Sequence, residues 1–249
     1  MTFNFGDIFH KSAKDRTMRG LVNIPLDSSL WPKSWRTVYY KEYTRFKKIK
    51  LPQPNMSVDI SQAVIGRRSV REWGSGSISL QEISNILFFS CGITEHALDE
   101  NKSKRAQASA GGRYPIEVYF LIFKEGELKR AVYHYNVKEH ALDVLYDLDS
   151  IDKNLIETMY SKRWDEEASL GIIITGVVSR TVSKYGERGY RYMYLEAGAV
   201  AQTMSTVADS QGIGCVIMGG TNDTDIEKVL DIDGDEETHI ISLLAGKKK

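Results

Sequence analysis

The apolar run Gly171–Val178 constrains the fold of this chain more than any other segment. It is short and continuous, which is typical of a central strand buried on both faces. In the following segment, Arg188–Ser210, apolar residues recur at spacings of three and four, which predicts a long helix with one small apolar face. A helix face so rich in alanine allows close approach by a partner helix, as across a dimer interface. Together the two segments favour the α+β class.

Further elements complete an α+β order along the 249 residues. Ser79 and Glu82 form a capping box before an apolar helical stretch, and Gly92 is the expected end of that helix. Shorter helices are expected from Ser57 to Gly66, near 151–160 and near 225–230, and residues 96–113 are expected to form a loop. Strands are expected at Ile116–Phe123, Arg130–Tyr135, Leu142–Tyr146, Cys215–Met218 and Ile240–Ala245, with the first two forming a hairpin.

Residues 1–54 differ in composition from the remainder and are expected to be an N-terminal extension packed on a main domain of residues 55–249. Trp35, Tyr39 and Tyr43 recur at helical spacing, which predicts a short, buried helix within the extension. Residues 1–50 hold eleven Lys or Arg and four Asp or Glu. This excess is either a solvated surface or a face for an acidic partner or peptide.

Composition excludes several function classes. The 33 basic and 33 acidic residues leave no net field to favour nucleic acid or anionic lipid. Cys91 and Cys215 lack CxxC spacing and lie in apolar sequence, which indicates buried thiols, no disulfide framework and no metal site. The first residues lack a secretory apolar region, and no apolar run approaches the ~20 residues that a spanning helix needs. We therefore expect a cytoplasmic protein without a membrane segment.

Four short motifs are candidates for binding an anionic or flat ligand. Arginines just after a helix concentrate guanidinium donors that can bind a phosphate, and glycine-rich turns let backbone N–H groups approach a ring or a phosphate closely. Each motif also has a structural reading, as a helix end, an ordinary turn or a frayed tail. The residues are Arg67, Arg68, Ser69 and Arg71; Ser109, Ala110, Gly111, Gly112 and Arg113; Met218, Gly219 and Gly220; and Lys247 and Lys248.

A fifth motif carries reactive groups. Lys184 and Tyr185 are adjacent on what the sequence indicates is a glycine-rich turn. An ammonium beside a phenol lowers the phenol's pKa from its usual value near ~10, and the phenolate so favoured is a base. The hypothesis is that this pair removes a proton from a substrate, although neighbouring residues on a turn need not face one another.

These motifs, with the block Arg188-Gly189-Tyr190-Arg191-Tyr192 and the segment Leu195–Gly198, make the chain resemble the SagB-type azoline dehydrogenases of the nitroreductase superfamily. The resemblance covers nearly the full length. It implies an α+β, FMN-binding, nitroreductase-like fold with a central, mostly antiparallel sheet flanked by helices, in a homodimer whose subunits share each flavin site. Ala108 and Ala199 depart from the family pattern, which has proline and histidine there.

The resemblance also implies roles for the motifs. Lys184 and Tyr185 would be catalytic, and the other four motifs would bind FMN, with the segment around Met218 near flavin N5 and the C-terminal lysines near the phosphate. The implied reaction is the two-electron oxidation of thiazoline or oxazoline rings to thiazoles or oxazoles in a ribosomal peptide or related natural product, with a cyclodehydratase as a partner.

Two alternatives remain open. The first is an NAD(P)H-dependent nitro- or quinone reductase on the same scaffold. The second is a non-catalytic subunit that carries flavin for a peptide-modifying complex, which the departures at Ala108 and Ala199 would suit. The intact Lys184–Tyr185 pair favours an enzyme over this second alternative.

Overall fold

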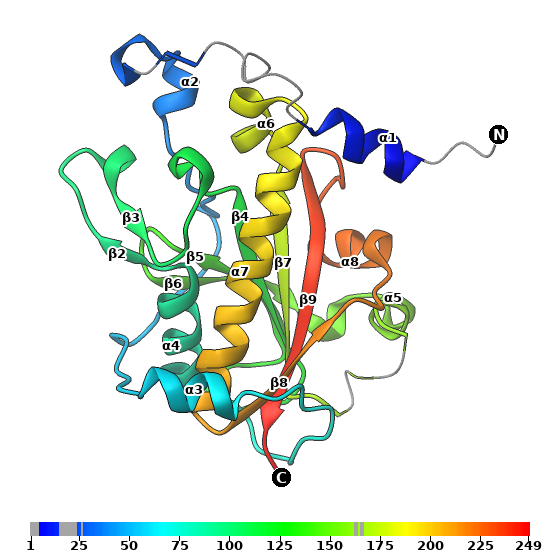
Figure 1. The fold of residues 1–249 in the computed structure, drawn as a ribbon. Helices are drawn as coiled ribbons and strands as arrows, with labels where there is room; N and C mark the ends of the chain where they lie inside the picture. Colours follow the sequence, from blue (N-terminus) through cyan, green and yellow to red (C-terminus); the bar gives the residue numbers. More distant parts are fainter. Residues whose placement is uncertain (1–4, 15–23, 26, 162–163, 165–166) are drawn as a thin grey trace.

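A seven-stranded antiparallel sheet forms the centre of the computed structural model, which describes residues 5–14, 24–25, 27–161, 164 and 167–249 (Figure 1). The predicted extension of residues 1–54 thus lies partly outside the described residues. The strands of the sheet, in spatial order, are β1 (Lys48–Lys50), β6 (Ala141–Asp147), β5 (Ala131–Asn136), β4 (Ile116–Ile122), β7 (Leu170–Val177), β9 (Glu237–Lys247) and β8 (Ile213–Met218).

Strand β7 lies between β4 and β9 and is buried on both faces, as predicted from its continuous apolar run. Because successive side chains of a strand point to opposite faces, Ile172 and Ile174 join one hydrophobic cluster while Ile173 joins another. All three isoleucines are fully buried. Each such side chain contributes roughly 1.5–3 kcal/mol through burial, so this strand anchors the cores on both sides of the sheet.

Helices cover both faces of the sheet (Figure 1). Helices α4 and α7 contribute to the cluster around Ile172, and α5 and α8 contribute to the cluster around Ile173. The α-helices are α1 (Phe5–Ser12), α2 (Lys33–Arg36), α3 (Ile60–Gly66), α4 (Leu80–Cys91), α5 (Lys153–Thr158), α6 (Ser179–Tyr185), α7 (Arg188–Ser210) and α8 (Asp223–Leu230). The chain has the predicted α+β architecture of an antiparallel sheet flanked by helices.

Two of the predicted helix boundaries have clear local causes. The capping box at α4 is formed as expected, with the Ser79 side chain accepting from the Glu82 backbone and the Glu82 carboxylate accepting from the Ser79 N–H (2.9 Å). Helix α7 spans the predicted residues and packs closely on β7. This is possible because Gly176 has no β-carbon, and any β-carbon there would clash with the sulfur of Met193. The long helix is thereby fixed along the centre of the sheet.

The helix predicted for the aromatic stripe is wrong, and the predicted loop 96–113 contains more regular structure than expected. Only Lys33–Arg36 of the predicted aromatic stripe is helical, because the carbonyls of Ser34, Trp35 and Thr37 accept hydrogen bonds from Arg113 and the chain continues in an extended conformation. Tyr39 is accordingly exposed. The predicted loop 96–113 contains part of a two-stranded ladder, β2 (Ile93–Glu95) with β3 (Lys104–Arg105), and short 3-10 turns at 100–102 and 110–112.

Two searches of the described residues found nothing. No described helix combines the length and the apolar character needed to cross a bilayer. No group of three or more His, Cys, Asp or Glu side chains in the described ranges is arranged to hold a metal ion.

Candidate functional site

The structure brings two of the predicted motifs together at Gly111. This residue lies in the turn Ala110–Gly112 with a φ of 61°, in the left-handed region that favours glycine. A β-carbon there would clash with the Tyr185 hydroxyl and lie 2.9 Å from Lys184 Nζ. The glycine-rich turn and the Lys184–Tyr185 pair therefore form one wall of a common site, although they are more than 70 residues apart in sequence.

Lys184 and Tyr185 occupy the last turn of α6, not the glycine-rich turn predicted from the sequence, and Gly186 ends that helix. Lys184 is only 2% exposed. Its Nζ lies 3.5 Å from the centroid of the Trp31 ring and 5.3 Å from that of the Tyr185 ring. Tyr185 packs edge-to-face on Tyr192, with 5.1 Å between ring centroids. The two reactive groups are thus held between aromatic rings.

This environment shifts the two pKa values in directions that correct the sequence-based hypothesis. Burial raises the pKa of the Tyr185 phenol, with a further rise from Tyr192 that Arg113 only partly opposes. Burial also lowers the pKa of the Lys184 ammonium, and the charge of Arg113 adds to that effect. Burial disfavours the charged form of each group, so the Tyr185 phenol releases its proton less readily than an ordinary tyrosine and the Lys184 ammonium releases its proton more readily than an ordinary lysine.

Glu196 is a candidate residue that the motif analysis missed. It lies on the buried face of α7, is 4% exposed and accepts a hydrogen bond from Gln107 Nε2 (3.2 Å), with the Ser109 hydroxyl as a second hydrogen-bonding neighbour. Burial raises the pKa of its carboxyl to about 7. The available sequence signal was an acidic residue at the helical spacing of the apolar face, three residues after Met193.

Glu196 borders a cavity of about 370 Å³ beside the glycine-rich turn. The cavity combines two residues of the predicted FMN-binding motif with the exposed side of α7, and the small side chain of Ala199 contributes to its wall. The lining consists of Ala108, Ser109, Ala110, Tyr192, Leu195, Glu196 and Ala199. A buried carboxyl with a pKa near neutrality beside a cavity is a feature that recurs at functional sites.

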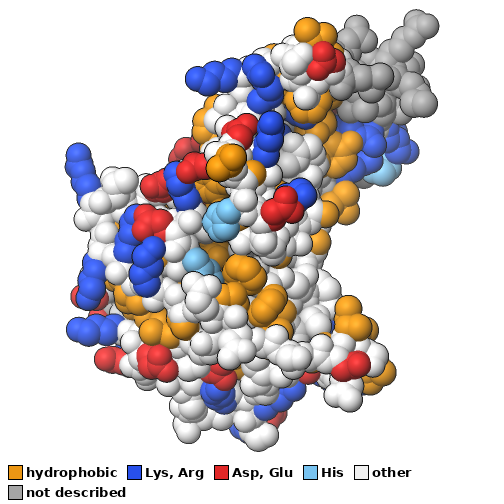
Figure 2. Space-filling view, turned by 90° about the vertical axis from the view of Figure 1, so that its left-hand side faces the viewer, with side chains coloured by type: hydrophobic (Ala, Val, Ile, Leu, Met, Phe, Trp, Pro, Cys, Tyr) orange, Lys and Arg blue, Asp and Glu red, His pale blue; other side chains and the backbone are white. Residues whose placement is uncertain are grey.

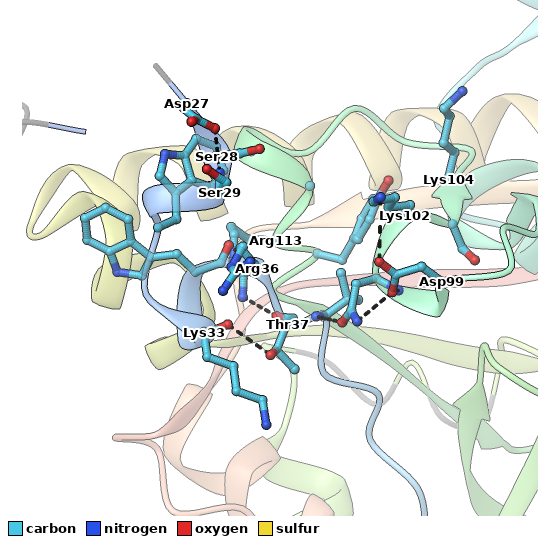
Figure 3. Close-up of a pocket in the computed structure, with 18 residues that line it drawn as sticks. Asp27, Ser28, Ser29, Lys33, Arg36, Thr37, Asp99, Lys102, Lys104 and Arg113 are labelled. Atoms are coloured by element: carbon cyan, nitrogen blue, oxygen red, sulfur yellow. Dashed lines mark hydrogen bonds and ion pairs between the residues drawn. The ribbon is translucent and has the colours of Figure 1, made fainter. Parts of the chain in front are cut away.

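Arg113, a predicted cofactor ligand, has a different arrangement from the rest of its motif. Its guanidinium donates to the carbonyls of Trp35 (2.6 Å), Ser34 (2.9 Å), Arg180 (3.1 Å) and Thr37. These bonds use four of the five N–H donors of an arginine. Arg113 therefore joins the N-terminal segment to α6 and has little capacity left for a cofactor (Figure 3).

A second group of predicted residues gathers near the C-terminal end of α7. Ser69 bridges Cys215 of β8, and the Arg68 guanidinium donates to the carbonyls of Ile65 (2.7 Å) and Arg67 (2.8 Å). Arg68, Ser69 and Arg71 are exposed. The predicted phosphate ligands Lys247 and Lys248 form ion pairs in this chain, with Glu82 and with Asp209 (2.8 Å) respectively.

The predicted segment Met218–Gly220 lies at neither of these places. The register of β8 on β9 pairs Ile213 with Lys247 and Met218 with Ser242. At ~3.4 Å per residue, Met218 lies about 17 Å along the strand from the lysine end. Gly219 and Gly220 are exposed.

The two groups of predicted residues lie at opposite ends of α7 (Figure 1). Helix α6, with Lys184 and Tyr185, precedes its first residue, and α3, with the arginine motif after it, packs on α7 so that Gly66 is close to Asp209. A rise of 1.5 Å per residue over this helix corresponds to roughly 30 Å. One chain alone therefore does not bring the arginine motif to the Lys184–Tyr185 pair.

Comparison with protein families matches residues 64–246 to the model described as "Nitroreductase family". Protein MJ1384 of Methanocaldococcus jannaschii, which carries a nitroreductase name, is 30% identical over 201 residues, covering 81% of this chain and 96% of its own.

Two further relatives have names that refer to peptide processing. The trifolitoxin-processing protein TfxB of Rhizobium leguminosarum is 25% identical over 90% of this chain, and the microcin B17-processing protein McbC of Escherichia coli is 26% identical over 54% of it. This chain spans about half the length of each, 55% and 51% respectively.

Solved structures show the same fold. A nitroreductase-type protein from Anabaena variabilis superposes with a TM-score of 0.73 and 25% identity, over 96% of this chain and 45% of that chain. A chain of the E. coli microcin synthetase McbBCD complex gives 0.62 and 20%, over 98% and 92%. A nitroreductase-type protein from Desulfovibrio desulfuricans, solved in complex with FMN, gives 0.52 and 15%, over 78% and 88%.

Proposed function

The chain belongs to the nitroreductase family, and on that premise we propose that it is an FMN-dependent oxidoreductase that oxidises thiazoline or oxazoline rings of a peptide to aromatic azoles. The observation that carries the proposal is the contact of Lys184 and Tyr185 with Gly111. The names of TfxB and McbC, two processing proteins, support a peptide substrate. Ring oxidation then needs a group that accepts a proton, and this pair supplies one.

The residues present fit FMN. Exposed guanidinium groups follow α3, and the turn Ala110–Gly112 carries no side chain larger than a methyl group, so a flat ring can approach its backbone. When bound, FMN would accept the hydride that leaves the ring. We propose that its phosphate and its isoalloxazine ring are held by Arg67, Arg68, Ser69, Arg71, Lys247 and Lys248, by Ser109, Ala110, Gly111 and Gly112, and by Met218, Gly219 and Gly220.

Lys184 and Tyr185 would divide the proton transfer between them. The α-proton of an azoline is acidic because the resulting carbanion is conjugated with the ring C=N bond and the neighbouring carbonyl. A lowered pKa makes the neutral amine of Lys184, which accepts the proton, more available than in an ordinary lysine. A phenol with a raised pKa holds its proton more strongly and can donate a hydrogen bond to the ring nitrogen. Loss of one proton and one hydride then leaves the aromatic azole.

We further propose that the working unit is a homodimer in which each site combines the arginine motif of one copy with the Lys184–Tyr185 pair of the other. The separation of these groups along α7 supports this proposal. So does the apolar surface beside them: Ile60 and Val64 of α3 are 79% and 64% exposed, and Leu195 of α7 is 66% exposed. Exposed apolar side chains beside both groups of residues are expected of an interface that covers both.

A cyclodehydratase partner is part of the same proposal. An azoline has to be formed from the peptide by loss of water before it can be oxidised, so an enzyme of that class must act first. The similarity to a chain of the McbBCD complex supports a complex of this kind. Co-purification from the native source, followed by mass spectrometry of the bound proteins, would test it.

The test is to replace Lys184 by Ala and Tyr185 by Phe in the FMN-loaded protein, with Lys153→Ala on the distant helix α5 as the matched control. We expect the variants to keep their flavin and to lose azole formation, measured as a mass decrease of two hydrogens, by about 10²–10⁴-fold. The control should retain activity. Wild-type turnover in both variants would overturn the proposed role.

A nitro- or quinone reductase is the second candidate, which the match to MJ1384 favours. It predicts that NAD(P)H bleaches the flavin rapidly and that an azoline peptide does not. The opposite pattern, with bleaching by the azoline peptide under anaerobic conditions, is expected from the first proposal.

A further inference from the structure

A cavity of about 690 Å³ lies between the N-terminal segment and the glycine-rich turn, and no step proposed so far uses it. Residues 27–38 form one wall, and residues 99–104, from the turn and strand that follow β2, form another (Figure 3). Gly111, Gly112 and Arg113 complete the lining. The cavity therefore adjoins the turn against which Lys184 and Tyr185 pack.

The lining of this cavity is basic. It includes five cationic side chains, those of Lys33, Arg36, Lys102, Lys104 and Arg113, against two carboxylates, those of Asp27 and Asp99. Figure 2 shows that Lys and Arg side chains recur, among acidic ones, over the upper part of the face that carries α2 and the β2–β3 ladder.

The two carboxylates are already engaged by the turns they begin. Asp27 accepts from the Ser29 N–H (2.8 Å), and Asp99 accepts from the Asn101 N–H (3.1 Å). Lys102 Nζ lies 3.9 Å from the Asp99 carboxylate, close to the longest distance at which two such groups form an ion pair. Lys104 is paired with Glu95 of β2 (2.9 Å), so the unbalanced positive charge of the lining comes from Lys33, Arg36 and Arg113, with Lys102 only loosely paired.

The burial of Arg113 raises the energetic cost of the unbalanced positive charge in the lining. This side chain is 1% exposed, and each of its hydrogen bonds goes to an uncharged backbone carbonyl, with no ion pair to a carboxylate in the part of the chain that the structure describes. Buried charges are normally paired. Burial and the neighbouring Arg180 lower the pKa of the Arg113 guanidinium. An anion in the adjoining cavity would stabilise this charge.

The position of the cavity limits what the anion can be. Gly111 lines the cavity on one side and contacts the Lys184–Tyr185 pair on the other, so one glycine residue separates the cavity from the pair. A chain that places one side chain in the cavity would therefore pass directly beside the reactive groups. A peptide can do this, and a free ion would leave the rest of the volume unused.

We propose that this cavity binds an acidic side chain of the peptide substrate, a glutamate or aspartate close in sequence to the ring that is oxidised. The inference rests on the proposed function for the identity of the peptide, but binding is measurable without turnover. Lys33 and Arg36 on one wall and Lys102 on the other select for the carboxylate. The main competing anion is a phosphate, either free or that of the cofactor.

The experiment uses the purified, FMN-loaded protein and two fluorescein-labelled peptides, one with two glutamates among glycines and a twin with two glutamines. At low salt we expect the acidic peptide to bind at least about fivefold more tightly, since each exposed ion pair contributes up to about that factor, and the preference should shrink as salt screens it. The double variant Lys33→Glu/Arg36→Glu should abolish the preference.

Controls keep the proposal falsifiable. Lys129→Glu, an exposed charge change in the turn after β4, should leave the preference intact, and Lys102→Glu should reduce it from the opposite wall. Flavin content and circular dichroism verify that each variant is folded. Equal binding of the two peptides would overturn the proposal. Complete displacement of the acidic peptide by a stoichiometric amount of free FMN or inorganic phosphate would overturn it as well. Loss of azole formation with preserved peptide preference would contradict the proposed function alone.

Discussion

Replacing Glu196 by Gln should make the protein more stable at neutral pH. The carboxyl of Glu196 is buried beside the glycine-rich turn, where Gln107 and the Ser109 hydroxyl are its hydrogen-bonding neighbours, fewer donors than the two oxygens of an ionised carboxylate can accept from. Burial of a carboxylate without full hydrogen bonding is unfavourable. Glutamine has nearly the same shape and cannot ionise, so it removes this cost while retaining an acceptor for Gln107.

The size and sign of the effect follow from the pKa. Burial raises the pKa of Glu196 from its ordinary 4.5 to about 7, so the folded protein holds this proton over a pH range in which the unfolded chain has released it. Between pH 4.5 and about 7 the free energy of unfolding therefore falls as pH rises. At 1.36 kcal/mol per pH unit, the loss from this one group is about 3 kcal/mol, and it is complete above pH 8.

Urea unfolding at several pH values between 4 and 8.5 measures this directly. The difference between Glu196→Gln and wild type cancels the other titrating groups and should grow by about 3 kcal/mol, in favour of the variant, from the acid to the alkaline end. Glu125→Gln, an exposed glutamate in the turn after β4, is the control and should show a flat difference. A flat difference for Glu196→Gln as well would refute the account of a buried, proton-holding carboxyl.

Three further changes test the fold and the site. Ser79→Ala removes the cap of α4 and should lower the free energy of unfolding by about 1 kcal/mol, and unchanged urea midpoints would contradict the capping role. Gly111→Ala should displace the neighbouring phenol and abolish azole formation with the overall fold retained, as judged by circular dichroism. His134→Leu removes a partner of two buried carboxylates, those of Asp143 (3.2 Å) and of Glu117 (2.9 Å), and only Glu117 keeps an ion pair, with Arg180 (2.6 Å). It should destabilise by about 3–5 kcal/mol, and because the pKa of His134 is raised, this loss should be largest at acid pH.

Much of the fold could be predicted from local pattern. The apolar run of β7, the capping box of α4 and the periodicity of α7 each express a rule that acts within a few residues, and all three are confirmed. The helix predicted through Trp35, Tyr39 and Tyr43 is wrong because contacts distant in sequence determine the conformation of this segment. Arg113 binds carbonyl groups that a longer helix would have used for its own hydrogen bonds.

The candidate site shows the same division. The residue types at Lys184, Tyr185 and Gly111 could be read from the sequence, but their contact, and the direction in which burial shifts the two pKa values, depend on tertiary packing. Glu196 was not singled out from the sequence, because its burial and the rise of its pKa come from packing against the glycine-rich turn. The distance between the arginine motif and the Lys184–Tyr185 pair depends on the length of α7 and on the packing at its two ends. Neither can be predicted from a single motif.

Complementation between two inactive chains tests the shared site most directly. One chain carries Arg67→Ala/Arg68→Ala and the other carries Lys184→Ala/Tyr185→Phe, and the two are mixed under conditions that let subunits exchange. If each site is built from two copies, a mixed dimer has one site with both defects and one with none, so about a quarter of wild-type azole formation should return after random exchange. If no activity returns although mixed dimers are present, each site lies within a single chain and the account is contradicted.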